Sequence, residues 1–274
     1  MVFFLYFQVL TLKFFYFGIF RSNKNIFKAF FTLSVIVLVI FMLSRVPRHI
    51  GVILDGNRRF ARRLMLKPWK GHEWGAKKIE HLLSWCREYS IPEVTFYAFS
   101  LENFSRSKEE FDRLMDIFIS ELSRLLKDPV LEKEDIRVQF IGRLSLFPLP
   151  LQEVMHNLMV RTAAHKTYFV TFAMAYSGRA EIIDATKRLA ESVRAGTLSV
   201  EGINEDVFTR NTYLPSEPDL IIRTSGEQRT SGFLLWQGAY AELYFCPKMW
   251  PEFEKEDFLL ALESYSQRKR RFGR

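Results

Sequence analysis

From residue 46 onward, short apolar runs alternate with segments whose apolar residues recur at helical spacing. The apolar runs predict buried strands at 49–54, 93–99, 136–141, 168–176, 219–223 and 242–245. The intervening segments predict helices at 75–89, 107–126, 151–164, 179–195 and 258–271, the second of them with Ser107 and Glu110 as a start signal. Strands that alternate with helices favour a parallel sheet with helices on both faces. We therefore predict an α/β fold with a mostly parallel central sheet flanked by helices.

The first 45 residues have a different character. Residues 2–20 are dominated by Phe, Leu, Tyr and Val, and residues 29–43 form a second apolar run. The second run is shorter than the roughly 20 residues that span a bilayer, although basic flanks can reach the headgroups. A membrane anchor, a cleaved targeting peptide and a buried helix are three interpretations, and basic flanks without acids favour the anchor. We expect residues 1–45 to be a hydrophobic membrane segment and 46–274 to be one domain.

The charge distribution bears on possible partners. The net charge is +8, but residues 1–49 contain six basic residues and no acid, which leaves 33 basic and 31 acidic residues in 50–274. The excess positive charge therefore belongs to the N-terminal segment, and the remainder has no nucleic-acid-binding motif. We expect no nucleic-acid partner. Cys86 and Cys246 lie far apart without a CxxC context, which argues against a zinc site or a disulfide framework.

The most unusual polar residues follow predicted strands, where ligands bind in open α/β sheets. The first strand runs into Asp55, Gly56 and Asn57, and four arginines, Arg59 among them, lie between residues 58 and 63. Glycine permits a tight turn, a helix N-terminus offers free N–H groups to phosphate, and arginines bind phosphate oxygens. A lone carboxylate in this setting is either a Mg²⁺ ligand beside phosphates or a helix cap.

Two shorter motifs allow both a functional and a structural interpretation. His72 lies just before a predicted helix, where it either donates to a diphosphate oxygen or serves as a capping or packing residue. Ser100, Asn103 and Arg106 follow the second predicted strand, where they either contact a polar ligand or form a hydrogen-bonded turn.

The strand at 219–223 runs into a second cationic loop. Arg223 and Arg229 lie six residues apart around a glycine turn, and Ser231 follows them. This concentration of cations and hydroxyls favours a second phosphate-binding loop. Glu242 lies among apolar residues, where its carboxylate must be paired by a salt bridge or by a metal. Two phosphate sites with acids for Mg²⁺ indicate an enzyme that joins two diphosphates, and the chain has neither a GxxxxGK[ST] nor a DDxxD motif.

Taken in order, these segments resemble the cis-prenyltransferase family, which includes undecaprenyl and dehydrodolichyl diphosphate synthases. The matching motifs are HIGVILDGNRRFA, GHEWG, FYAFSLENFSRS, IIRTSGEQRTSGFLLWQ and AELYF, followed by Trp250-Pro251 and Arg271-Phe272-Gly273. Several ordered motifs are far more specific than any one of them. The first and third are more similar to eukaryotic dehydrodolichyl diphosphate synthases than to bacterial enzymes.

The resemblance implies a Mg²⁺-dependent enzyme that condenses isopentenyl diphosphate onto an allylic diphosphate such as farnesyl diphosphate, with an apolar tunnel for the product. It implies that Asp55 and Asn103 are catalytic residues and that Asp55 and Glu242 are metal ligands. The residues expected around the allylic diphosphate are Gly56, Asn57, Arg59 and His72, and those expected around isopentenyl diphosphate are Arg223, Arg229 and Ser231. Ser100 and Arg106 are expected to shape the site. In the family, the Arg271-x-Gly273 pattern completes the site across a dimer interface.

The sequence departs from the family pattern at three positions, one of which is Arg58, where bacterial members have Gly. Pro68 stands four residues before His72, where many members have an arginine that contacts the allylic diphosphate. Lys67 or Lys70 is the expected substitute. Gly232 follows Ser231 where the family usually has Asn or Asp.

The resemblance also concerns partners and location. Some eukaryotic members are non-catalytic subunits that pair with an active one, but those lose the Asp and the arginine-rich loop that are present here. Because the chain also has the terminal Arg271-x-Gly273 pattern, we expect a homodimer, with a heteromer as the alternative. The implied product is a dolichol precursor for protein glycosylation. The implied location is the endoplasmic reticulum membrane, with the catalytic domain, 46–274, facing the cytosol.

Overall fold

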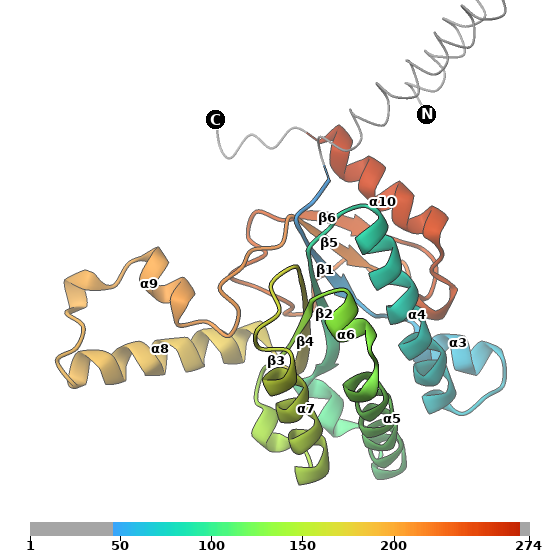
Figure 1. The fold of residues 1–274 in the computed structure, drawn as a ribbon, viewed down its shortest axis with the longest axis horizontal. Helices are drawn as coiled ribbons and strands as arrows, with labels where there is room; N and C mark the ends of the chain where they lie inside the picture. The colour runs from blue at the N-terminus through green and yellow to red at the C-terminus, as the bar shows by residue number, and fades with distance from the viewer. Residues whose placement is uncertain (1–45, 269–274) are drawn as a thin grey trace, which may run out of the picture. The chain divides into compact units, whose positions relative to one another are not determined.

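A six-stranded sheet forms the centre of the computed structural model, which describes residues 46–268 (Figure 1). The strands are β1 His49–Ile53, β2 Glu93–Ser100, β3 Ile136–Ile141, β4 Tyr168–Tyr176, β5 Leu220–Arg223 and β6 Glu242–Phe245. Their order across the sheet is β3-β4-β2-β1-β5-β6, and every neighbouring pair runs parallel. The predicted α/β class and parallel sheet are confirmed.

The described helices lie between these strands and after the last one. They are α3 Asn57–Arg63, α4 Pro68–Glu88, α5 Lys108–Lys127, α6 Val130–Lys133, α7 Leu149–Arg161, α8 Gly178–Arg194, α9 Glu205–Arg210 and α10 Lys255–Gln267. Short 3₁₀ helices occur at η1 Leu101–Ser105, η2 Leu144–Leu146, η3 Val200–Gly202 and η4 Trp250–Glu252.

Alternate side chains of the strands face two separate cores. Ile50 and Val52 of β1 belong to the larger core, which α4, α5, α7 and α10 cover. Ile53 points to a smaller core that is closed mainly by Phe233 and Leu234 of the segment after β5. Helix α8 instead runs outward from the sheet and, with α9, forms a projecting arm (Figure 1). Helices therefore cover one face of the sheet more fully than the other.

Two helix boundaries test the sequence predictions. Ser107 accepts a hydrogen bond from the Glu110 N–H and starts α5, so the predicted start signal is confirmed. Helix α4 begins at Pro68, seven residues before the predicted start, because the fixed φ of proline suits the first helical turn. His72 therefore lies inside this helix, and its predicted place before a helix is wrong. A β-carbon on Gly71 would lie 1.9 Å from the Asn57 carbonyl oxygen, so glycine at this point of α4 allows α3 to pack closely.

Some predictions concern residues beyond the described part of the chain. The hydrophobic segment at 1–45 and the terminal Arg271 and Gly273 lie outside it. Within residues 46–268, no helix is both long and apolar enough to cross a bilayer.

Candidate active site

The carboxyl ends of β1, β2 and β5 bring the predicted residues to one edge of the sheet. The Thr224 hydroxyl donates to the Asp55 carbonyl over 2.7 Å, which joins the segments that follow β1 and β5. Gly56 turns the chain into α3 with a φ of 106°, and a β-carbon there would lie 2.8 Å from Cβ of Met249. Glycine is therefore required both by the backbone conformation and by the close approach of the 249–250 segment.

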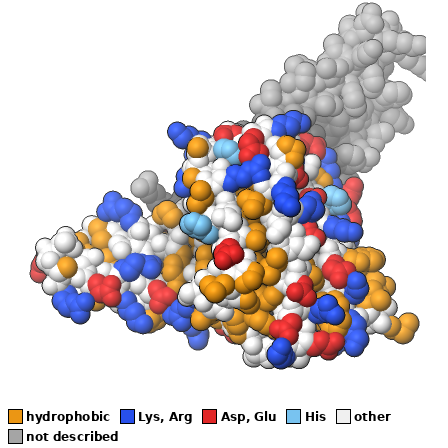
Figure 2. All heavy atoms as spheres, turned by 60° about the horizontal axis from the view of Figure 1, so that its bottom comes forward, with side chains coloured by type: hydrophobic (Ala, Val, Ile, Leu, Met, Phe, Trp, Pro, Cys, Tyr) orange, Lys and Arg blue, Asp and Glu red, His pale blue; other side chains and the backbone are white. Residues whose placement is uncertain are grey.

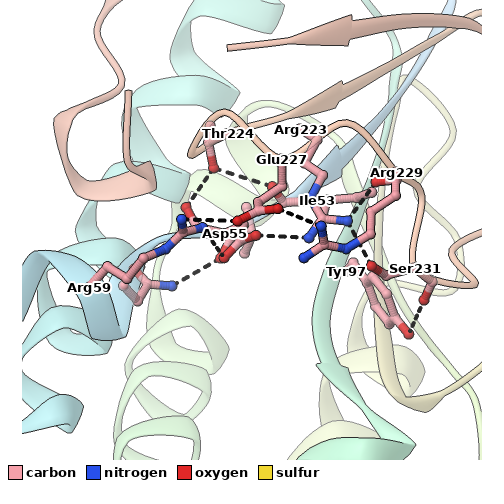
Figure 3. Close-up of polar contacts among 11 residues, drawn as sticks. Ile53, Asp55, Arg59, Tyr97, Arg223, Thr224, Glu227, Arg229 and Ser231 are labelled. Atoms are coloured by element: carbon pink, nitrogen blue, oxygen red, sulfur yellow. Dashed lines mark hydrogen bonds and ion pairs between the residues drawn. The ribbon is translucent and has the colours of Figure 1, made fainter. Parts of the chain in front are cut away.

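Asp55 is the centre of a cationic cluster (Figure 3). Its Oδ2 accepts a hydrogen bond from Arg223 Nη2 at 2.8 Å, and its Oδ1 lies 3.4 Å from Arg59 Nη2. Arg59 also contacts Glu227 at 3.1 Å, and Glu227 pairs with Arg229. The hydrogen bond from Arg229 lowers the pKa of Glu227, which keeps this carboxylate ionised. Three arginines thus converge on two acids from loops far apart in the sequence.

Ser231 belongs to the same cluster. Its hydroxyl accepts a hydrogen bond from Arg223 Nη1 at 2.7 Å, and the Arg229 carbonyl accepts another at 2.5 Å. Ser231 has a φ of 50°, a conformation that most side chains avoid. The Tyr97 hydroxyl lies 3.4 Å from the Ser231 carbonyl oxygen. Burial raises the pKa of Tyr97, so its phenol remains protonated and able to donate.

A second cluster is built from α3, α4, α5 and the short segment between η1 and α5. Arg106 Nη1 lies 3.2 Å from His72 Nε2 and 3.1 Å from Glu110 Oε1. Arg58 Nε approaches the same Glu110 oxygen at 3.3 Å. Burial, together with the charges of Arg106 and Arg58, lowers the pKa of His72 to about 3. A neutral imidazole can accept the hydrogen bond from Arg106 and can rotate to donate to an anion instead.

Asn57, Ser100 and Asn103 are held mainly by short-range hydrogen bonds. Asn103 Oδ1 accepts from the Ser100 N–H at 3.1 Å, as part of a reciprocal cap of η1. Asn57 Nδ2 donates to the Leu54 carbonyl at 3.1 Å. Among the described residues, buried Asn57 Oδ1 and Arg223 Nε have no hydrogen-bond partner. Both atoms are shielded from solvent, and Asn57 Oδ1 faces Gly75 of α4, so their lack of partners is a cost of close packing at the site.

A cavity of about 920 Å³ opens at these clusters and extends beneath the sheet. Its mouth is polar, with Asp55, Asn57, His72, Ser100, Asn103, Arg106, Arg223 and Ser231 among its lining residues. Its interior is mainly apolar and is lined by α4, α5 and the strands β2, β3 and β4, including Leu114, Phe118, Val138 and Phe172. The charged residues Glu80, Arg87, Glu121, Arg124 and Asp128 also belong to the lining. A site of this shape suits an amphiphile with an anionic head and a long hydrocarbon tail.

The structure does not bring Glu242 to Asp55 within one chain. The register of β5 and β6 pairs Leu220 with Glu242 and Arg223 with Phe245, so Glu242 lies about 10 Å from the ligand-binding edge along the strand. Its carboxylate instead forms an ion pair with Arg268 at 2.6 Å. The salt bridge, one of the two interpretations of this residue, is therefore the one seen in the described residues.

The donor set fits Mg²⁺ that arrives with a substrate. Residues 46–268 contain no cluster of three or more His, Cys, Asp or Glu side chains suited to a metal. Mg²⁺ is commonly held by one or two carboxylates together with substrate phosphates and waters. Asp55 provides one carboxylate at the cavity mouth, beside Arg59 and Arg223, which suit the phosphates. When bound, Mg²⁺ would offset negative charge on the diphosphate.

The departure at Pro68 has no direct substitute in the structure. Lys67 lies 5.6 Å above the Trp69 ring, and Lys70 forms an ion pair with Glu73 at 2.8 Å. Neither lysine lines the cavity. The described cations nearest to His72 are instead Arg58 and Arg106, which share Glu110.

Comparison with known proteins decides the family. Residues 53–273 match the family model described as "Putative undecaprenyl diphosphate synthase". The chain belongs to the cis-prenyltransferase family. An isoprenyl transferase from Thermus thermophilus is 49% identical over 235 residues, which cover 83% of this chain and 89% of the relative. The chain is therefore a cis-prenyltransferase enzyme, as the sequence predicted.

Two further similar proteins extend the comparison. The tritrans,polycis-undecaprenyl-diphosphate synthase (geranylgeranyl-diphosphate specific) of Methanopyrus kandleri is 45% identical over 233 residues, covering 84% of this chain and 86% of the relative. The crystal structure of lavandulyl diphosphate synthase from Lavandula x intermedia, in complex with dimethylallyl diphosphate, has a TM-score of 0.81 and 36% identity, with 84% and 100% of the two chains covered. These relatives do not show the expected closeness to eukaryotic dehydrodolichyl diphosphate synthases.

Several residues of the site were not singled out from the sequence. The sequence pattern identifies Tyr97 only as a strand residue, Glu110 only as part of a helix start signal, and Glu227 only as a member of the glycine turn. Each of them contacts a predicted site residue. An acid four residues after Arg106, at a helix start, was an available signal for Glu110.

Proposed function

We propose that this cis-prenyltransferase condenses isopentenyl diphosphate repeatedly onto an allylic diphosphate and releases a long polyprenyl diphosphate. The observation that carries the proposal is the cavity, which has two cationic clusters at its mouth and an apolar interior. Two diphosphate substrates need two groups of cations, and a growing isoprenoid chain needs apolar volume. We assign the Asp55 cluster with Arg59 and Arg223 and the His72–Arg106 cluster to diphosphate binding.

The chemistry follows from this arrangement. The alkene of isopentenyl diphosphate attacks the allylic carbon, the allylic C–O bond breaks, and the diphosphate leaves with the bonding electron pair. Loss of a proton from the isopentenyl unit to the released diphosphate then forms the new cis double bond. The cations around the allylic diphosphate, Arg59 and Arg106, stabilise the charge that develops on the leaving group, which is the largest contribution expected from such a site. Asn103, in the cavity wall, orients the reacting ends of the substrates.

The allylic primer is proposed to be farnesyl diphosphate. The name of the Methanopyrus kandleri relative specifies geranylgeranyl diphosphate, and the lavandulyl diphosphate synthase was solved with dimethylallyl diphosphate. The apolar interior does not by itself favour one of these three tails over the others. A competition among the three primers therefore belongs in the first assay.

That assay uses the full chain with labelled isopentenyl diphosphate, each primer in turn, and Mg²⁺ with or without EDTA. Label should enter long apolar products with farnesyl diphosphate, and EDTA or the Asp55→Ala change should abolish incorporation. Incorporation that survives EDTA would contradict the proposed Mg²⁺ role. A folded chain that incorporates no label with any primer would support the alternative, a subunit that depends on a different catalytic partner.

The cellular setting is a further part of the proposal. The product serves dolichol synthesis and protein glycosylation, at the endoplasmic reticulum membrane, with the catalytic domain in the cytosol and the enzyme a homodimer. Support comes from the hydrophobic segment at 1–45 and from the terminal Arg271-x-Gly273 pattern. Light scattering of the purified protein tests the homodimer, and a monomer would contradict it. Fractionation of cells that express the tagged chain tests the membrane location, and an exclusively soluble chain would contradict it.

A further inference from the structure

The connection between α3 and α4 exposes an unusual group of apolar side chains. Leu64, Met65 and Leu66 are 41%, 95% and 42% exposed. Figure 2 shows hydrophobic side chains at the right-hand tip of the molecule, where Figure 1 places this connection. Contiguous apolar side chains at a projecting tip are typical of an interaction site rather than of an ordinary protein surface. The name "α3–α4 tip" is used below for residues 62–67.

The backbone of the α3–α4 tip gives a second observation. The Met65 N–H donates to the Arg62 carbonyl over 2.9 Å and the Leu66 N–H to the Ala61 carbonyl over 2.8 Å, which closes α3 with a left-handed residue at Met65. Its φ is 56°, and glycine is the usual residue at this position. A methionine here strains the backbone, and its exposed side chain adds nothing to the core. The side chain therefore points to a contact outside the described fold.

The charge around the α3–α4 tip indicates what that contact is. Residues 56–72 contain six basic residues and no acid. Arg63 pairs with Glu252 and Lys70 pairs with Glu73, whereas Arg62 and Lys67, both exposed, form no ion pair within the described residues. Trp69, which lies under the Lys67 ammonium group at 5.6 Å, adds an amphipathic ring of the kind enriched at membrane interfaces. An apolar tip with a basic rim is complementary to an anionic bilayer.

We propose that the α3–α4 tip docks onto an anionic phospholipid surface, inserting Leu64, Met65 and Leu66 at the level of the headgroups. This contact is separate from the predicted membrane segment at 1–45, and it concerns binding, so it does not depend on the proposed function. The helices on either side carry Asn57 and His72, which line the cavity mouth. Docking would therefore place the mouth beside the membrane, where an amphiphile with a hydrocarbon tail is concentrated.

The test places an environment-sensitive fluorophore on the full chain at Met65→Cys. Labelling is selective for the new cysteine because Cys86 and Cys246 are both buried. The matched control carries the same fluorophore at Val200→Cys, which is 64% exposed on η3 of the distant arm. Vesicles contain phosphatidylcholine alone or with phosphatidylglycerol. The control matters because another part of the chain can also bring the protein to vesicles.

The fluorophore at position 65 is expected to emit at a shorter wavelength and more brightly on anionic vesicles, and added salt should reverse this change. The emission of the fluorophore at position 200 should not shift. The Arg62→Gln/Lys67→Gln double variant should raise the lipid concentration for half-maximal signal by about tenfold or more, since each interfacial cation contributes several-fold to affinity. Two results would overturn the proposal. One is equal signals at positions 65 and 200 on vesicles. The other is a shift at position 65 without vesicles, which would assign the tip to a protein contact.

A second variant separates docking from folding. Met65→Gly removes the apolar side chain and relieves the left-handed strain, so the melting temperature should be unchanged or higher. For this measurement the fluorophore is placed at Leu64→Cys. Its emission shift on anionic vesicles should be smaller in the chain that also carries Met65→Gly than in the chain that keeps Met65. An undiminished shift would overturn the role of the methionine side chain.

Discussion

Arg223, at the end of β5, donates from Nη2 to Oδ2 of Asp55, just after the end of β1, over 2.8 Å. The Arg223 side chain is only 6% exposed, whereas that of Asp55 is 28% exposed and lines the cavity mouth. A buried guanidinium depends on its acid for charge balance. The pair therefore combines a structural role for Arg223 with a position in which Asp55 can still reach a ligand.

Replacing Asp55 with asparagine tests both roles. Asp55→Asn keeps the size of the side chain but removes the charge that faces Arg59 and Arg223. Turnover should fall about 100-fold or more, because the loss affects charge stabilisation at the reacting diphosphate. Unfolding in urea should show a smaller effect, a loss of about 1–3 kcal/mol from the weakened pair. Asp112→Asn, in an exposed ion pair with Lys108, is the matched control and should change neither quantity measurably. Near-normal turnover in Asp55→Asn would remove this residue from the mechanism.

Glu110 is predicted to position Arg106. Its side chain is 6% exposed and contacts both Arg106 and Arg58. Glu110→Gln should leave Arg106 less well oriented beside His72, so KM for the allylic diphosphate should rise about tenfold, with a loss of stability of about 1–3 kcal/mol. Glu109→Gln, one residue earlier on the exposed side of α5, provides the comparison. A fall in turnover without any change in KM would argue against a positioning role.

His72 should make the enzyme sensitive to acid. Its pKa is lowered to about 3 in the folded chain, from an ordinary value near 6.5. Below pH 6.5 the unfolded chain therefore takes up a proton that folded His72 does not, and stability is lost progressively as the pH falls toward 3. At pH 5 this loss amounts to at most about 2 kcal/mol. His72→Gln should reduce the stability difference between pH 7 and pH 5 in urea unfolding. Identical pH dependence in the two proteins would contradict the shifted pKa. His49 is unchanged in both proteins, so its own lowered pKa cancels in this comparison.

The apolar interior of the cavity should set product length. Val138 lies in the amino-terminal half of β3, away from the polar mouth, and its side chain lines the cavity. Val138→Phe should leave the first condensations nearly unchanged and shift the products to shorter chains, which thin-layer chromatography of the dephosphorylated products can resolve. Val200→Phe makes the same substitution at an exposed site. An unchanged product distribution in Val138→Phe would show that the growing chain leaves by another route.

The sequence was sufficient to predict those parts of the site that depend only on the order of residues and the direction of the strands. Asp55 and Arg223 each follow an apolar run, and parallel strands bring such residues to one edge, so a separation of 168 positions did not obscure the cluster. Gly56 was expected to turn the chain, and its positive φ bears this out. These inferences needed only the polarity pattern and the rule that parallel strands end together.

Other features depend on contacts that periodicity does not encode. Helix α4 starts early at Pro68, whereas the close packing of Gly71 and Gly75 against Asn57 becomes evident only once α3 and α4 lie side by side. Glu110 matches a common helix start signal, yet its carboxylate contacts two arginines. Leu114 and Phe118 are spaced like core residues, and the sequence could not distinguish a wall of a cavity from a filled interior.

The sheet order has a consequence for synthesis of the chain. Of the described strands, β1 is the first to leave the ribosome. One of its two neighbours is β5, and Ile221 pairs with Gly51 only after 170 further residues have been made. At about 5–20 residues per second, the first strand waits on the order of ten seconds or longer with one edge unpaired. A chaperone that shields this strand edge would act during that interval. Truncation anywhere before β5 would leave a nascent chain that is both inactive and prone to pair with another chain.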